Sequence, residues 1–145
     1  MDRGGGLLIE GYASLFGVED LAGDVVRAGA FARSLARGDG VPMLLQHRGG
    51  QVAGVWTRIR EDGRGLFVRG LLTGETAAGR MAVQMAGDGE MSGLSIGFIA
   101  RDWSPRRERG RELKAIELRE VSLVSEPMAP AARFRVLTSA RRKAA

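Results

Sequence analysis

The stretch from Gln51 to Leu72, QVAGVWTRIREDGRGLFVRGLL, decides the class of fold. On both sides of the Asp62-Gly63 step, the residues alternate in the two-residue period of a strand with one buried face. An Asp-Gly step between two such runs is typical of a tight turn between antiparallel strands. The stretch therefore predicts a β-hairpin with its turn at residues 61–65.

Other segments on either side of the hairpin also have strand character. Leu7–Phe16 alternates in the same way, and Leu94–Asp102 is apolar and extended in character. Glu112–Val124 is ambiguous between helix and strand, although its β-branched end favours a strand.

Two segments have helical signals instead. Ala28–Arg37 spaces Phe31 and Leu35 four residues apart, which places them on one helix face. Glu75–Met85 is rich in alanine and straight-chain residues, which favour a helix.

The second predicted helix carries two further expectations. Thr73 is a candidate N-cap because its hydroxyl can accept a hydrogen bond from a free backbone N–H group. Met81 and Met85 lie at helical spacing and are predicted to pack in the core.

The order strand, helix, strands, helix, strands predicts an α+β fold that is mainly β. We expect a closed or nearly closed antiparallel β-barrel with helices outside it. The length of 145 residues suits one domain, which we place at residues 1–137, followed by a basic, disordered tail at 138–145.

Composition excludes several kinds of site. The chain has no cysteine and a single histidine, so we expect no disulfide, no metal site and no cofactor. No apolar stretch approaches the ~20 residues of a membrane span, and the N-terminal segment does not resemble a signal peptide. We therefore predict a cytoplasmic protein.

The basic surplus gives the formal net charge of +5. Part of it lies after Glu126, where no acid follows, and we interpret it as a solvated tail. Aromatic residues are few and are not interleaved with basic residues along the chain, so no stacking platform for bases is visible and a nucleic-acid partner is not expected. The basic residues of this region are Arg133, Arg135, Arg141, Arg142 and Lys143.

His47 is the first candidate for chemistry. It ends the apolar run that begins at Val41, and it precedes Gly49-Gly50. A strand formed by this run would therefore place a lone imidazole at its end, next to flexible backbone. Imidazole suits proton transfer near neutral pH. A single histidine is also often structural or simply exposed.

Ser95 is the second candidate, between Gly93 and Gly97. The glycines would let a substrate backbone approach and would expose amides for an oxyanion. The alternative is a serine bonded locally in a strand, with glycines at bulges. Ser92 is a rival nucleophile; Ser122 and Ser125 are more distant ones.

Glu120 is the third candidate. A serine needs a base, and the base works better when a carboxylate orients it. The alternative for Glu120 is a surface ion pair with Arg119 or Lys114.

Four stretches between about Gly11 and Ala132 together resemble the prohead (capsid maturation) proteases of tailed phages. This family is similar to the herpesvirus maturation proteases, in which helices wrap a barrel and the chain order is histidine, serine, histidine. The resemblance implies the set His47, Ser95 and Glu120, with a carboxylate in the third place. The stretches are Gly11–Ser14 with Phe16, Asp24–Phe31 with Ser34-Leu35, Pro42–His47, and Gly93–Phe98 with Leu118–Val124 and the prolines Pro127 and Pro130.

The resemblance implies a serine endopeptidase that cleaves the scaffolding segment of the major capsid protein, and itself, inside a procapsid in the host cytoplasm. It also implies a homodimer, by analogy alone. The basic run that helps hold the oxyanion in the herpesvirus enzymes is replaced here by Ser125-Glu126-Pro127. Backbone amides beside Ser95, Arg48 or Arg101 are the candidates that remain.

Two other functions stay open at this point. One is an inactive capsid scaffold or assembly chaperone with a protease fold, and the other is a small basic nucleic-acid-binding barrel. The resemblance implies that the source is a phage, a prophage or a gene-transfer particle.

Overall fold

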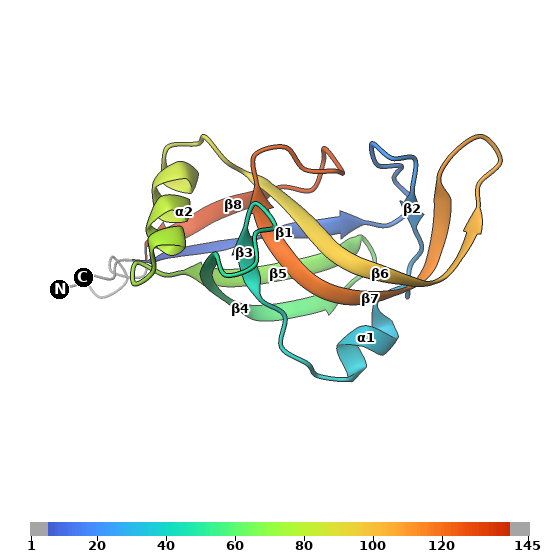
Figure 1. Ribbon diagram of the computed structural model, residues 1–145, viewed down its shortest axis with the longest axis horizontal. Helices are drawn as coiled ribbons and strands as arrows, with labels where there is room; N and C mark the ends of the chain where they lie inside the picture. Colours follow the sequence, from blue (N-terminus) through green and yellow to red (C-terminus); the bar gives the residue numbers. More distant parts are fainter. Residues whose placement is uncertain (1–5, 140–145) are drawn as a thin grey trace.

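The computed structural model describes residues 6–139 of the chain. Figure 1 shows an elongated, strongly twisted sheet with two helices against it. The elements are β1 (Leu7–Leu15), β2 (Val25–Val26), α1 (Ala32–Ala36), β3 (Met43–Leu45), β4 (Val52–Glu61), β5 (Gly65–Leu72), α2 (Ala77–Gly87), β6 (Gly93–Pro105), β7 (Arg111–Val124) and β8 (Phe134–Ser139).

The strands form one sheet in the order β2-β7-β3-β4-β5-β1-β8, with β6 paired to β7. The predicted class, α+β and mainly β, is confirmed. The described strands do not close into a complete barrel, because β6 meets the segment before β8 only at the bridge between Gly93 and Arg133. The sheet is also not purely antiparallel. β2 and β3 both run parallel to β7, at its beginning and near its end, and α1 lies on the crossover between them.

The predicted hairpin is β4–β5, and its turn is held by the side chain of Asp62. The Asp62 carboxylate accepts the backbone N–H groups of Arg64 at 2.8 Å and Gly65 at 3.2 Å. Its other oxygen accepts the hydroxyl of Tyr12 at 2.5 Å. The hydrogen bond from Tyr12 lowers the pKa of Asp62 and raises the pKa of Tyr12.

The ambiguous segment Glu112–Val124 is strand throughout, as part of β7. It pairs antiparallel with β6 in a long hairpin whose far end extends beyond the rest of the sheet (Figure 1). Residues 121–124 are buried, because β3 and β6 flank them on either side. Packing between two strands favours β-branched residues here.

The first helix is shorter than predicted. Gly29 has a φ of 90°, which a helix cannot contain, so α1 begins only at Ala32. Phe31, just before it, is fully buried in the core, and Leu35 packs against the core.

The second helix is capped by Thr76 rather than Thr73. The Thr76 hydroxyl accepts the N–H of Gly79 at 2.9 Å, whereas the Thr73 hydroxyl accepts that of Glu75 at 3.1 Å. Because α2 begins four residues later than Thr73, that residue lies in the preceding loop.

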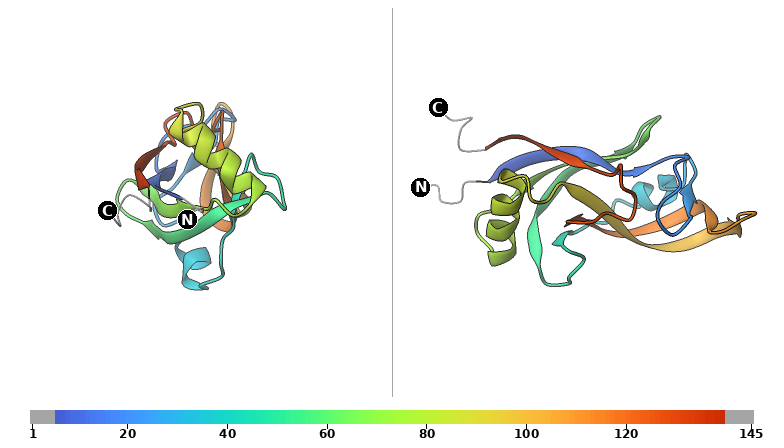
Figure 2. Two further views of the ribbon diagram at one scale, coloured as in Figure 1. Left: turned by 90° about the vertical axis from the view of Figure 1, so that its left-hand side faces the viewer. Right: turned by 90° about the horizontal axis from the view of Figure 1, so that it is seen from above.

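The prediction that Met81 packs in the core is wrong. Its side chain is 52% exposed, because the helix turns a face of small residues inward. Those residues let α2 approach closely across the end of the sheet, as Figure 2 shows. Met85 does pack partly against the core. The inward face is Ala78, Gly79, Ala82 and Ala86.

At the C-terminal end, β8 extends two residues into the predicted tail, since Thr138 and Ser139 pair with Leu8 and Leu7. The rest of that predicted tail lies outside the described residues. Within residues 6–139, no helix is long and apolar enough to cross a membrane.

Candidate active site

His47 lies just beyond the end of β3, where the chain turns sharply. Gln46 and His47 have φ values of 55° and 62°, a left-handed conformation that is uncommon for residues with a side chain. Contacts with the end of β7 hold this turn. The Gln46 N–H donates to the carbonyl of Leu123 at 2.9 Å, and its side-chain amide donates to the Ser125 hydroxyl at 2.9 Å.

Ser95 and Glu120 are brought together by the register of β6 and β7. Ser95 lies opposite Ser122, and Gly97 lies opposite Glu120. Since residues two apart on a strand share a face, these four positions form one small cluster on one side of the ladder. Ser95 itself is 7% exposed.

The Glu120 carboxylate joins His47 to Ser122. One oxygen, Oε2, lies 2.7 Å from Nδ1 of His47, and the other, Oε1, accepts the hydroxyl of Ser122. A carboxylate can only accept hydrogen bonds, so Nδ1 of His47 carries the hydrogen and Nε2 of the neutral ring is an acceptor. Arg119, the expected partner in a surface ion pair, contacts Glu117 instead.

The space beside Ser95 is not open to a substrate in the way that its flanking glycines suggested. A Cβ at Gly97 would lie 2.3 Å from an oxygen of Glu120, and one at Gly93 would lie 2.7 Å from Pro127. Both spaces are therefore filled by side chains of this chain. Gly97 is required because the Glu120 carboxylate lies over its Cα.

His47 and Ser95 line the same cavity, of about 310 Å³. Its walls come from β1, β6, β7 and the loops after β1 and β7, and most of the lining side chains are apolar, such as Leu15, Phe98 and Met128. A mostly apolar cavity with a few polar groups is typical of a ligand site.

An ion pair between the buried Asp24 and the partly exposed Arg111 also lines this cavity. Burial opposes ionisation of Asp24, but the hydrogen bonds from the side chain and backbone of Arg111 outweigh it and keep the pKa of Asp24 below its usual value. The same contact raises the pKa of Arg111. The side chain of Asp24 is 8% exposed.

The rival serines do not line this cavity. The Ser92 hydroxyl accepts a hydrogen bond from Arg133 at 3.1 Å, Ser122 is bonded to Glu120, and Ser125 is bonded to Gln46. From the sequence alone, Ser122 is only a distant rival of Ser95 as the nucleophile. The alternation Glu120-x-Ser122 in a predicted strand is the signal that could have placed both on one face.

Of the candidate oxyanion residues, Arg101 is engaged elsewhere, since its Nε donates to Glu117 at 2.8 Å. Arg48 is exposed and does not line the cavity. Backbone amides beside Ser95 are the candidates left. Within residues 6–139, no group of three or more histidine, cysteine or acidic residues is placed to hold a metal ion.

The chain is similar to known viral proteases in both sequence and structure. The sequence model of a family described as caudovirus prohead serine protease matches residues 2–144. The prohead protease of Enterobacteria phage HK97 is 38% identical over 125 residues, which are 83% of this chain and 55% of that protein. The chain thus spans about half the length of this relative.

The solved structures that it resembles are herpesvirus proteases. KSHV protease in complex with a hexapeptide phosphonate inhibitor has a TM-score of 0.62 at 14% identity and is matched over 89% of this chain and 64% of its own. Varicella-zoster virus protease has a TM-score of 0.58 at 14% identity, over 89% of this chain and 63% of its own. At this identity, the likeness shows the fold.

Proposed function

Because the chain belongs to the caudovirus prohead serine protease family, we propose that it is a serine endopeptidase that cleaves the scaffolding segment of a capsid protein, and itself, during procapsid maturation. The observation that carries this proposal is the placement of His47 between Glu120 and the cavity that it shares with Ser95.

In the proposed reaction, Ser95 is the nucleophile and His47 the base. Nε2 of His47 takes the proton of the Ser95 hydroxyl as its oxygen bonds to the scissile carbonyl carbon. When the carbon–nitrogen bond breaks, the same proton passes to the leaving amine. His47 then takes a proton from water, which attacks the acyl group, and returns it to the Ser95 oxygen as that bond breaks.

Glu120 acts through His47. Its hydrogen bond to Nδ1 fixes the ring tautomer that leaves Nε2 free, and its charge stabilises the imidazolium that forms in each step. The Ser122 hydroxyl holds the second oxygen of the carboxylate and so fixes its orientation. Ser122 is therefore a positioning residue.

The proposed surroundings follow from the proposed activity. The substrate is the major capsid protein with its scaffolding segment, met inside an assembling procapsid in the host cytoplasm. Self-association as a homodimer is an expectation from the herpesvirus fold.

Co-expression with the capsid protein tests the activity. The capsid protein is measured by intact mass with the wild type, Ser95→Ala, His47→Ala and the control Ser92→Ala. We expect a shortened capsid protein with the wild type and the control, and a full-length one with the other two variants. Equal cleavage in all four would contradict the proposed site. No cleavage in any of them, with particles still assembling, would favour an inactive scaffold.

A further inference from the structure

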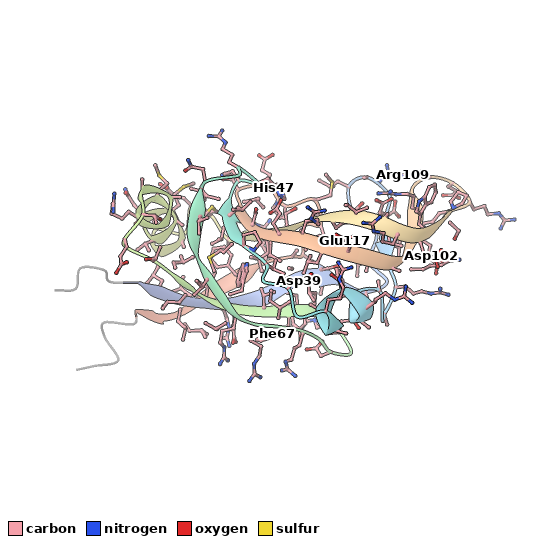
Figure 3. The ribbon with its side chains drawn as sticks, turned by 60° about the horizontal axis from the view of Figure 1, so that its bottom comes forward. Asp39, His47, Phe67, Asp102, Arg109 and Glu117 are labelled. Atoms are coloured by element: carbon pink, nitrogen blue, oxygen red, sulfur yellow. The ribbon has the colours of Figure 1, made fainter. Side chains whose placement is uncertain are left out.

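The outer face of β4, β5, β1 and β8 gathers arginines from distant parts of the chain. We call this surface the arginine face. Phe67 lies at the centre of the arginine face, and Figure 3 shows it on the side of the molecule away from His47. The arginine face is therefore separate from the candidate active site. Its arginines, all exposed, are Arg58, Arg60, Arg64, Arg69, Arg133 and Arg135.

One row of side chains crosses the four strands. The register places Arg58 opposite Arg69, Arg69 opposite Glu10, and Glu10 opposite Arg135. Glu10 accepts hydrogen bonds from Arg69 at 2.7 Å and from Arg135 at 2.8 Å, and these two contacts lower its pKa.

Arg58 differs from Arg69 and Arg135 in this row, because those two arginines are paired with Glu10. Like charges directly opposite one another on neighbouring strands repel, and Arg58 faces Arg69. No carboxylate of the described residues forms an ion pair with Arg58, whereas Arg69 has Glu10. An anion from outside would relieve this repulsion.

A second row lies two residues further along the strands, about 6.7 Å away. In it, the guanidinium group of Arg60 lies 5.4 Å from the ring centre of Phe67. Next to Phe67 is Tyr12, with Arg64 5.1 Å over its ring. Stacking on a ring holds a guanidinium group flat, with its N–H groups available at the edge.

A groove of about 550 Å³ lies along this second row, and the rings of Tyr12 and Phe67 line it together with Arg64, Arg133 and Arg135. The carboxylates nearby are already bonded, Glu10 to two arginines and Asp62 to the Tyr12 hydroxyl. The groove is therefore both aromatic and cationic.

We propose that the arginine face binds single-stranded nucleic acid. Guanidinium edges suit phosphate oxygens, and two neighbouring aromatic rings, each with a guanidinium group beside it, suit the stacking of bases. The combination of rings and arginines on one surface favours a nucleic acid over an acidic peptide, which would use only the charges. The folded chain thus supplies the interleaving of arginines and aromatics that the linear sequence lacks.

Fluorescence anisotropy with a labelled 20-nucleotide oligothymidine tests the proposal. The full chain carrying Ser95→Ala is used, so that self-cleavage cannot interfere. Arg58→Gln, Arg60→Gln and Arg64→Gln are combined in one variant. The control combines Arg33→Gln, Arg80→Gln and Arg107→Gln, exposed arginines elsewhere, and it removes the same charge.

We expect the first triple variant to raise Kd more than tenfold and the control less than threefold. The slope of log affinity against log salt should fall by about 2 in the first variant, because about 0.7 of a counterion is released per phosphate contact. If the first variant unfolds, Arg64→Gln alone should still weaken binding at least threefold.

The stacking part is tested with Phe67→Leu, which should weaken binding while leaving the salt slope unchanged. Equal weakening by both triple variants would overturn the proposal, as would no binding by the wild-type surface. Displacement of the oligothymidine by polyglutamate as readily as by unlabelled oligothymidine would also overturn it, in favour of an acidic peptide.

Discussion

Two carboxylates near the same cavity are held in different ways. Asp24 lines the cavity and is bonded to the guanidinium group and backbone N–H of Arg111, at 2.8 to 3.3 Å. Glu120 lies behind His47 and is bonded to two side chains that carry no permanent charge, His47 and Ser122. Both carboxylates are largely buried.

In the proposed mechanism, the difference separates a carboxylate with a structural role, Asp24, from one that takes part in the chemistry, Glu120. The charge of Asp24 is balanced at all times by a permanent cation, so it can join β2 to β7 but cannot respond to a reaction. Within residues 6–139, the only cationic partner of Glu120 is His47, which carries a positive charge only when its ring holds a second proton.

The largest expected effect is that of Glu120→Gln on catalysis. An amide can donate to Nδ1 and so favours the wrong tautomer of His47, which should lower kcat/KM by about 10³–10⁴-fold. The free energy of unfolding should change little. Glu117→Gln, on the same strand but bonded to Arg101, is the control and should stay within about threefold. Cleavage kinetics with both variants would refute the contrast if the two losses were equal.

Asp24→Asn should have the opposite effect to Glu120→Gln: it should lower the stability of the protein and leave its activity almost unchanged. It leaves Arg111 without its partner and should cost about 2–3 kcal/mol in the free energy of unfolding, measured with urea. Activity per folded molecule should remain within a few-fold of the wild type. A loss of activity as large as that of Glu120→Gln would place Asp24 in the chemistry.

Gly97→Ala should act as a weaker form of Glu120→Gln. The added methyl group would take the space of the Glu120 carboxylate and move it from His47, lowering kcat by about 10²-fold. Gly87→Ala is the matched control, since nothing lies within 4 Å of a Cβ there. An unchanged kcat for Gly97→Ala would show that the position of Glu120 does not matter.

Ser122→Ala should lower kcat about tenfold, with KM unchanged, because Glu120 keeps its charge but loses one of its two fixed contacts. The control is Ser34→Ala, which removes a serine hydroxyl away from Glu120 that accepts the backbone N–H of Leu118 at 2.9 Å. Equal effects of the two variants on kcat would indicate that Ser122 contributes only to stability.

The smallest effect is the pH dependence of stability. Because the pKa of Asp24 is lowered in the folded protein, its contribution is fully present above the unfolded pKa of about 3.9 and is lost as the pH falls through the folded value. Urea unfolding between pH 5 and pH 2.5 should show a steeper loss for the wild type than for Asp24→Asn. Parallel curves would contradict this.

Features that depend on residues close together in the sequence could be predicted from it. The hairpin β4–β5 was predicted because its alternation and its turn lie within one stretch, and β6 because its apolar run is continuous. The helical spacing of Met81 and Met85 was real, but spacing does not tell which helix face turns inward. The family resemblance selected His47, Ser95 and Glu120 by their order along the chain.

Features that depend on register could not be predicted. Gly97 is needed because Glu120 lies opposite it on the neighbouring strand. Only the β6–β7 pairing shows that these two residues face each other. The same holds for the arginine face, where Arg58 and Arg135 share a row although their positions in the chain are far apart.

The most direct test of the central claim, that His47 held by Glu120 activates Ser95, is labelling with a fluorophosphonate probe followed by peptide mapping. We expect one labelled residue, Ser95, in the wild type, strongly reduced labelling in Glu120→Gln, and none in His47→Ala or Ser95→Ala. Labelling at Ser92, or labelling of Ser95 at the wild-type rate in His47→Ala, would contradict the account.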